Sequence, residues 1–187
     1  MYESSEFSNV ARRYLCRYYE ILDTMIQEMT SVQLSNSISH NFILQMIPHH
    51  RAAIEMSKNL LQYTTFVPLQ NIAANIIRSQ TKSIADMEAA FAACSGVRNT
   101  EQELHQYAQR FEEITQTMFA DMENARAANN INADFMREMI PHHEGAIRMS
   151  RNALRFPICP ALKPILEAII VSQTQGVREM ERLLQGI

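Results

Sequence analysis

Apolar side chains recur every three or four positions along most of the chain, which is the spacing of one face of an α-helix. Only four glycines occur in 187 residues, and the frequent Ala, Met, Gln and Glu are good helix formers. Prolines and glycines mark the breaks between the periodic stretches. The pattern predicts an all-α fold with six helices, at roughly residues 9–33, 41–62, 69–93, 100–128, 134–155 and 161–185. Asn41 and Asp134 are the expected N-caps of the second and fifth helices.

The chain is also an internal duplication. An offset of 93 residues, as from Met46 to Met139, aligns residues 14–88 with 107–181 without a gap. Ten of the twelve methionines fall into five equivalent pairs under this offset. We therefore predict a helical bundle of two tandem three-helix repeats, related by pseudo-two-fold symmetry and packed as one compact unit. The first repeat covers residues 1–93, and the second covers residues 100–187.

Composition and charge narrow the class of protein. With 47% hydrophobic residues and a formal net charge of -3, the chain is not expected to bind nucleic acid or an anionic membrane surface. No stretch approaches about eighteen apolar residues, so membrane insertion is not expected. The opening sequence MYESSEFSNVARRYL lacks an export signal, which predicts a cytoplasmic protein as given, although a mature periplasmic or secreted form would look the same. Association into a homo-oligomer stays open.

The three cysteines, Cys16, Cys94 and Cys159, lie far apart and form no Cys-x-x-Cys motif. We expect each of them to be a buried thiol, because three scattered cysteines make neither a disulfide framework nor a zinc site. Cysteine therefore adds no candidate chemistry.

Each half carries the string Met-Ile-Pro-His-His at the same place in its second predicted helix. A proline inside a helix removes a backbone hydrogen bond, so we expect a kink just before the histidines. Adjacent helix positions point in different directions, so the two histidines of one helix are not expected to hold one ion together. A metal site shared between the repeats, with one histidine from each, would avoid this difficulty. The histidines are His49, His50, His142 and His143, and the methionines that recur beside them are Met46, Met56, Met139 and Met149.

A second methionine pattern lies on the first predicted helix of each half. Met25 and Met29 are one helical turn apart, as are Met118 and Met122. Thioether sulfur and imidazole nitrogen suit Cu(I), and by extension Ag(I), better than they suit Mg²⁺ or Ca²⁺. Neutral imidazole is the ligating form, so binding should weaken as acidification passes a pH of about 6.5. These residues are therefore candidate ligands of a copper ion.

Other interpretations stay open. Methionine at helical spacing often fills a core without binding anything. The histidines could instead form a buried polar network that fixes helix register in a scaffold or protein-interaction module. A zinc or iron enzyme is a further alternative, but the chain has neither a Glu-x-x-His pair for a di-iron centre nor a His-Glu-x-x-His motif. No signature assigns a catalytic residue or an enzymatic activity.

The duplicated strings resemble the signature of a known family. The segment FMREMIPHHEGAIRM, residues 135–149, is similar to the motif of the family called domain of unknown function 305, and the likeness covers both repeats. The resemblance implies a ferritin-like helical bundle of bacterial origin, often secreted or periplasmic, with copper binding in some members. It also implies that the histidines and methionines of the duplicated motif form the metal site. The first half departs from the motif at Ile43, Gln45 and Ala52, where the second half has Met136, Glu138 and Gly145. We therefore predict a protein that stores or buffers copper(I) or silver.

Overall fold

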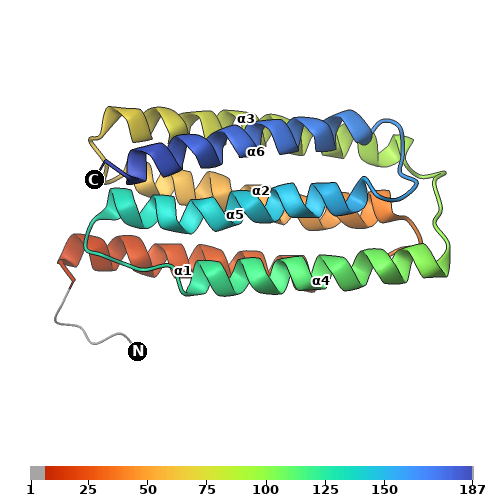
Figure 1. Cartoon of the computed structure of the whole chain (residues 1–187), viewed down its shortest axis with the longest axis horizontal. Helices are drawn as coiled ribbons and strands as arrows, with labels where there is room; N and C mark the ends of the chain where they lie inside the picture. The colour runs from red at the N-terminus through yellow and green to blue at the C-terminus, as the bar shows by residue number, and fades with distance from the viewer. Residues whose placement is uncertain (1–6, 187) are drawn as a thin grey trace.

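Six helices make up the computed structural model of the protein, which describes residues 7–186 (Figure 1). They are α1 (Asn9–Thr30), α2 (Ile38–Leu61), α3 (Val67–Ala93), α4 (Glu101–Glu123), α5 (Ile131–Ala153) and α6 (Lys163–Leu184). The described residues contain no strand, so the all-α helical bundle is confirmed. None of the helices in this range has both the length and the apolar character needed to cross a lipid bilayer.

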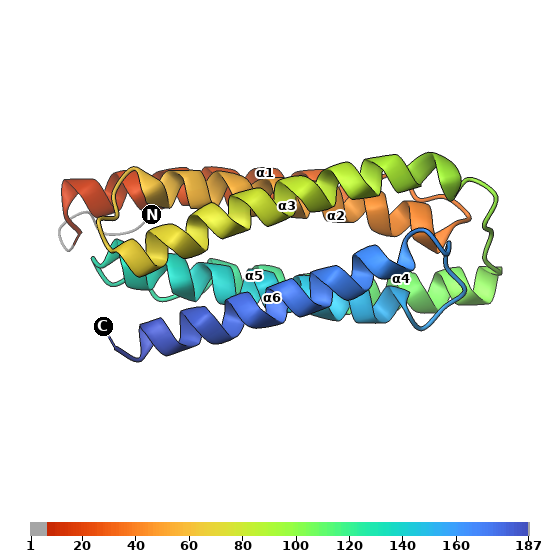
Figure 2. The ribbon, with the colours of Figure 1, turned by 90° about the horizontal axis from the view of Figure 1, so that it is seen from above.

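Helices α2 and α5 form the centre of the bundle. They contact each other, and each also contacts the two remaining helices of its own half. The third helices, α3 and α6, contact each other as well. Figure 2 shows the three helices of the first half lying beside the three of the second. This topology places both histidine motifs, which α2 and α5 carry, in the core.

The two central helices begin three residues earlier than the sequence predicts. The expected N-caps, Asn41 and Asp134, lie inside the helices, and their side chains accept hydrogen bonds from backbone N–H groups of the preceding loops at 2.7 and 2.8 Å. The actual N-caps are Ser37 and Asn130. Each side chain accepts a hydrogen bond from the backbone N–H group three residues further along the chain. The prediction failed because each helix start offers two residues that can cap, four positions apart.

The same hydrogen bond fastens the first helix to the second in each half. The side-chain amide of Asn59 donates to the backbone carbonyl of Tyr14, and that of Asn152 donates to the carbonyl of Tyr107. Both distances are 3.1 Å, and all four residues are buried. The duplication seen in the sequence is thus repeated in the packing of the core.

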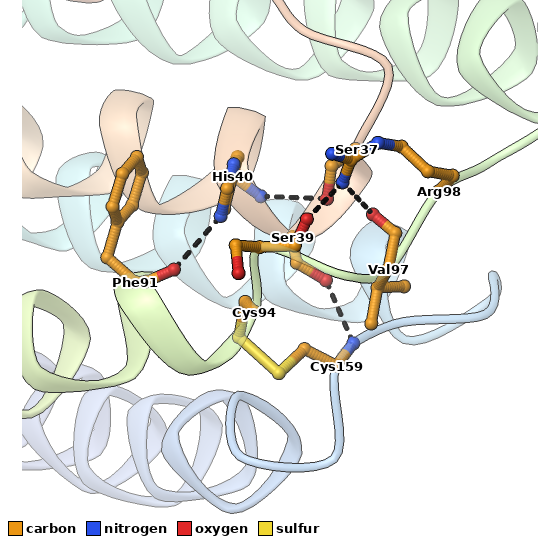
Figure 3. The surroundings of a disulfide bond; sticks show 9 residues. Ser37, Ser39, His40, Phe91, Cys94, Val97, Arg98 and Cys159 are labelled. Atoms are coloured by element: carbon orange, nitrogen blue, oxygen red, sulfur yellow. Dashed lines mark hydrogen bonds between the residues drawn. A yellow bond between two sulfur atoms is a disulfide. The ribbon is translucent and has the colours of Figure 1, made fainter.

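A disulfide bond joins Cys94, at the end of α3, to Cys159, in the loop before α6 (Figure 3). The hydroxyl of Ser39 supports this region by accepting a hydrogen bond from the backbone N–H of Cys159 at 2.9 Å. The expectation of three buried thiols is therefore wrong, since two cysteines are paired and Cys16 is exposed. The pairing joins residues 65 positions apart, and only the packing of the two halves brings them together.

Candidate metal centre

His49 and His142 meet where α2 and α5 contact each other. Their rings are stacked, with 3.6 Å between the centroids and 25° between the planes. Nε2–H of His142 donates to the backbone carbonyl of His49 at 3.1 Å. Because a carbonyl oxygen only accepts, the proton of neutral His142 lies on Nε2 and its lone pair lies on Nδ1. The centre of the bundle thus contains one imidazole from each half.

His50 and His143 turn away from this stacked pair. Their ring centroids lie 6.0 Å from that of His49 and 5.9 Å from that of His142, respectively. Nε2 of His50 forms a hydrogen bond of 3.1 Å with the hydroxyl of Ser83 on α3. His143 lies against the corresponding part of α6. Adjacent histidines therefore diverge, and the closest histidine pair belongs to two different helices.

Most of the ring nitrogens have no protein partner. Among the described residues, five of the eight are fully buried without a hydrogen bond: both nitrogens of His49 and Nδ1 of the other three histidines. A buried polar group left unpaired costs roughly 1–3 kcal/mol. The core therefore contains imidazole nitrogens that a bound ligand would satisfy.

Burial also keeps these imidazoles neutral. Removal from water lowers the pKa of His142 to about 4 and that of His50 to about 3. It also lowers the pKa values of His49 and His143 well below the ordinary value, and the neighbouring histidines lower them further because two imidazolium charges repel each other. Neutral imidazole is the form that ligates a metal, so all four side chains are in that form at neutral pH.

The eight candidate methionines all lie in the same core, each at most 2% exposed: Met25, Met29, Met46, Met56, Met118, Met122, Met139 and Met149. Met118 packs against the central helix α5. A Cβ placed on Gly145 would lie only 2.1 Å from the Met118 sulfur, so this sulfur rests on the backbone of α5 one turn after His142. At the equivalent place in the first half, Met25 and Ala52 line a surface groove between α1 and α2. The structure thus brings a thioether to a helix that carries the histidines.

The donor atoms of the core bear on which metal ion it suits. Within residues 7–186, no group of three or more His, Cys, Asp or Glu side chains is arranged to hold a metal ion. Zinc sites use at least three such ligands, and Ca²⁺ and Mg²⁺ sites use oxygen ligands. What the core offers is neutral imidazole together with thioether sulfur, which is a soft ligand set.

A buried carboxyl group near the histidines was not expected from the sequence. Glu138, one turn before His142, accepts a hydrogen bond from the hydroxyl of Tyr14, which belongs to the other half. Burial raises the pKa of Glu138 to about 8. At the equivalent position Gln45 lies 3.5 Å from the hydroxyl of Tyr107. The 93-residue offset pairs these residues in the sequence, but it does not reveal that they cross between the halves.

Two glutamines of the third helices are also part of the polar core. The side-chain amide of Gln80 is buried with neither its nitrogen nor its oxygen paired within the described range, and Oε1 of Gln173 is likewise unpaired. The two glutamines occupy equivalent positions, which predicts that each forms a hydrogen bond with a neighbouring helix, but the Gln80 side chain forms none with the described residues. These amides add to the unsatisfied polar atoms of the core.

Comparison with known proteins identifies the family. The model of the family described as domain of unknown function (DUF305) matches residues 23–91 and 39–184. The chain belongs to the DUF305 family. A DUF305 fragment from Deinococcus radiodurans has a similar structure, with a TM-score of 0.58, 22% identity, and coverage of 80% of this chain and 97% of that one.

A second structure of similar fold is CopM in an Ag-bound form obtained by soaking. It has a TM-score of 0.60 and 27% identity, and the match covers 83% of this chain and 98% of that one. No curated protein sequence matches this chain. The DUF305 assignment confirms the resemblance carried by the duplicated Met-Ile-Pro-His-His string.

Proposed function

We propose that this DUF305 protein binds Cu(I), or the chemically similar Ag(I), in its core and thereby stores or buffers the ion. The observation that carries the proposal is the set of five buried ring nitrogens without partners on the central helices α2 and α5. Methionine sulfurs pack in the same core, and sulfur with imidazole nitrogen favours a soft ion. The similar CopM structure contains silver, which supports this choice of metal.

The stacking of His49 and His142 constrains how such an ion binds. The lone pair of an imidazole nitrogen lies in the plane of its ring, so two stacked rings do not direct their lone pairs at one point between them. An ion shared by this pair therefore requires one ring to rotate. An ion held by a single imidazole and a thioether does not depend on this stacked pair, and the Met118 sulfur beside α5 is one candidate thioether. The ion is cargo in this proposal, and the protein supplies the donors.

The proposal is tested by anaerobic titration of the full chain with Cu(I) in competition with a chromophoric chelator. We expect the wild type to compete, and the double variants His49→Ala/His142→Ala and His50→Ala/His143→Ala to bind at least about tenfold more weakly. His105→Ala is the matched control, because this histidine is exposed on α4. Equal competition by the wild type and both double variants would overturn the proposal.

A structural role for the histidines is the second candidate function. It is favoured by the bond from His142 to the carbonyl of His49 and by the bond between His50 and Ser83, both of which connect separate helices. Buried hydrogen bonds of this kind fix how helices pack. If this is their whole role, the double variants will melt at lower temperature than the wild type without any change in Cu(I) binding.

We also infer that the protein works in an oxidising compartment. The bond between Cys94 and Cys159 supports the periplasmic or secreted alternative, because disulfides persist mainly outside the reducing cytosol. Thiol labelling of the unfolded, unreduced protein from its native cells tests this. We expect one reactive thiol, that of Cys16, and three labelled cysteines would contradict the inference.

A further inference from the structure

The third helices of the two halves differ at one place that faces a histidine. The 93-residue offset pairs Ser83 of α3 with Gly176 of α6. The Ser83 hydroxyl forms its hydrogen bond with Nε2 of His50 at 3.1 Å. Gly176 has no side chain that could do the same for His143. His50 and His143, the two outer histidines, therefore face different surfaces, although the helices that carry them match closely in sequence.

Gly176 is explained by the close approach of His143. A Cβ at this position would lie 2.9 Å from Cδ2 and 3.1 Å from Nε2 of the histidine ring. Glycine within a helix is less stable than alanine, so a larger residue would be favoured here if the ring were not in the way. The edge of the His143 ring that carries Nε2 therefore lies directly on the backbone of α6.

Nε2 of His143 has no hydrogen bond from the described residues, and its Nδ1 is buried without a partner. Both outer histidines are almost completely buried, at 3% exposed for His143 and 1% for His50, so what distinguishes them is the hydrogen bond at Nε2. The backbone of α6 at Gly176 lies against the Nε2 edge of the His143 ring, but glycine offers no side chain that could form a hydrogen bond with Nε2. At the Nε2 position, an incoming ion thus meets a nitrogen without a hydrogen bond on His143 and a hydrogen-bonded nitrogen on His50.

We propose that the residues Ser83 and Gly176 determine which outer histidine binds a soft monovalent ion more tightly, so that the ion binds first to Nε2 of His143. This inference rests on the proposed function. Binding there uses the Nε2 lone pair of the neutral ring while the proton stays on Nδ1, so no proton is released and no hydrogen bond is broken. The same step at His50 requires the bond to Ser83 to break first. The second half is therefore the stronger binding half.

Silver nitrate is the probe for the test, because Ag(I) undergoes no redox change and is diamagnetic. Long-range proton–nitrogen NMR spectra of the full chain, with nitrogen-labelled histidine, follow each ring nitrogen during titration. We expect Nε2 of His143 to shift at a lower silver concentration than any nitrogen of His50. His143→Ala should weaken the first binding step about tenfold more than His50→Ala does. Ser83→Ala should strengthen binding at His50 about tenfold, since it removes the hydroxyl that occupies Nε2.

His105→Ala controls for silver bound at exposed histidines, and thermal melting of each metal-free variant shows that it is folded. Equal weakening by His50→Ala and His143→Ala would overturn the inference, as would a Ser83→Ala variant that binds silver like the wild type. In both cases the proposed function would stand, because the wild type still binds. A wild type that binds no silver would overturn the inference and the proposed function together.

Discussion

The two halves of the protein carry the same pair of histidines in different surroundings. At three equivalent places near the histidines the first half has Gln45, Ala52 and Ser83, and the second has Glu138, Gly145 and Gly176. Each glycine of the second half lets another side chain rest on a helix backbone, and the serine of the first half holds its histidine by a hydrogen bond. The duplication thus preserved the candidate donors, while the residues packed against them diverged.

The largest predicted effect concerns what the halves share, their buried neutral histidines. An unfolded histidine has a pKa of about 6.5, whereas burial lowers the folded pKa of His142 to about 4 and that of His50 to about 3. As the pH falls from 6.5 towards 4, the unfolded chain takes up protons that the folded chain does not, so stability is lost with acidification. We expect a loss of roughly 3 kcal/mol or more by pH 4.

Urea unfolding at several pH values checks this prediction. The measurement is best made in Glu138→Gln, because Glu138 responds to pH in the opposite direction. A free energy of unfolding that stays constant from pH 7 to pH 4 would show that the histidines are not held neutral in the core. Saturating silver at pH 7 should raise the free energy of unfolding, because the assembled core should bind the ion more tightly than the unfolded chain does.

The disulfide between Cys94 and Cys159 joins the two halves covalently. It has no counterpart under the 93-residue offset, which pairs Cys159 with Phe66. Replacing Cys94 and Cys159 by serine should lower the free energy of unfolding by roughly 2–4 kcal/mol, because the unfolded chain regains the freedom of the closed loop. Cys16→Ser is the control and should change stability by less than about 0.5 kcal/mol, since this thiol is exposed. Denaturation curves that coincide for the paired and control variants would contradict the prediction.

Glu138 and Gln45 offer a direct exchange between the halves. The folded pKa of Glu138 is raised to about 8, so the folded group keeps its proton at pH values where the unfolded group has lost it. Its contribution to stability is therefore lost as pH rises from about 4.5 to 8. Glu138→Gln should flatten this dependence by roughly 1–3 kcal/mol, and Gln45→Glu should add a similar dependence to the first half. Unchanged pH profiles in both variants would refute the account of this site.

The crossed tyrosines give the smallest expected difference. Tyr14→Phe removes the hydroxyl that donates to buried Glu138 and should cost about 1 kcal/mol. Tyr107→Phe should cost less, because its hydroxyl lies 3.5 Å from the oxygen of Gln45, near the limit of a hydrogen bond. Thermal unfolding of the two variants side by side measures the difference. A larger loss for Tyr107→Phe would reverse the ranking of these contacts.

Much of the fold could be predicted from the sequence because helical periodicity is a local property. The predicted helix ends lie within five residues of the observed ones, and the divergence of His49 and His50 followed from helix geometry alone. The N-caps were misplaced because Asn41 and Ser37 are both able to cap and stand close together. In such cases the hydrogen bonds of the loop, rather than the residue type, decide where the helix begins.

Contacts between the halves could not be predicted. The stacking of His49 on His142 depends on how α2 packs on α5, and the bond between Cys94 and Cys159 depends on how two distant loops meet. The role of Gly176 follows only from the His143 ring that lies against it. The sequence pattern identifies the candidate metal ligands, whereas tertiary packing decides which of their nitrogen atoms lack a hydrogen bond.

The central claim is that a soft ion binds inside the bundle at the histidines and methionines of the core. A crystal structure of the silver-loaded protein, with silver located by its anomalous scattering, tests it most directly. We predict silver within bonding distance of a core imidazole, with His143 occupied first, and a core methionine sulfur as a further ligand. Silver found only on exposed side chains, with His49 and His142 still stacked and all four histidines unbound, would contradict the account.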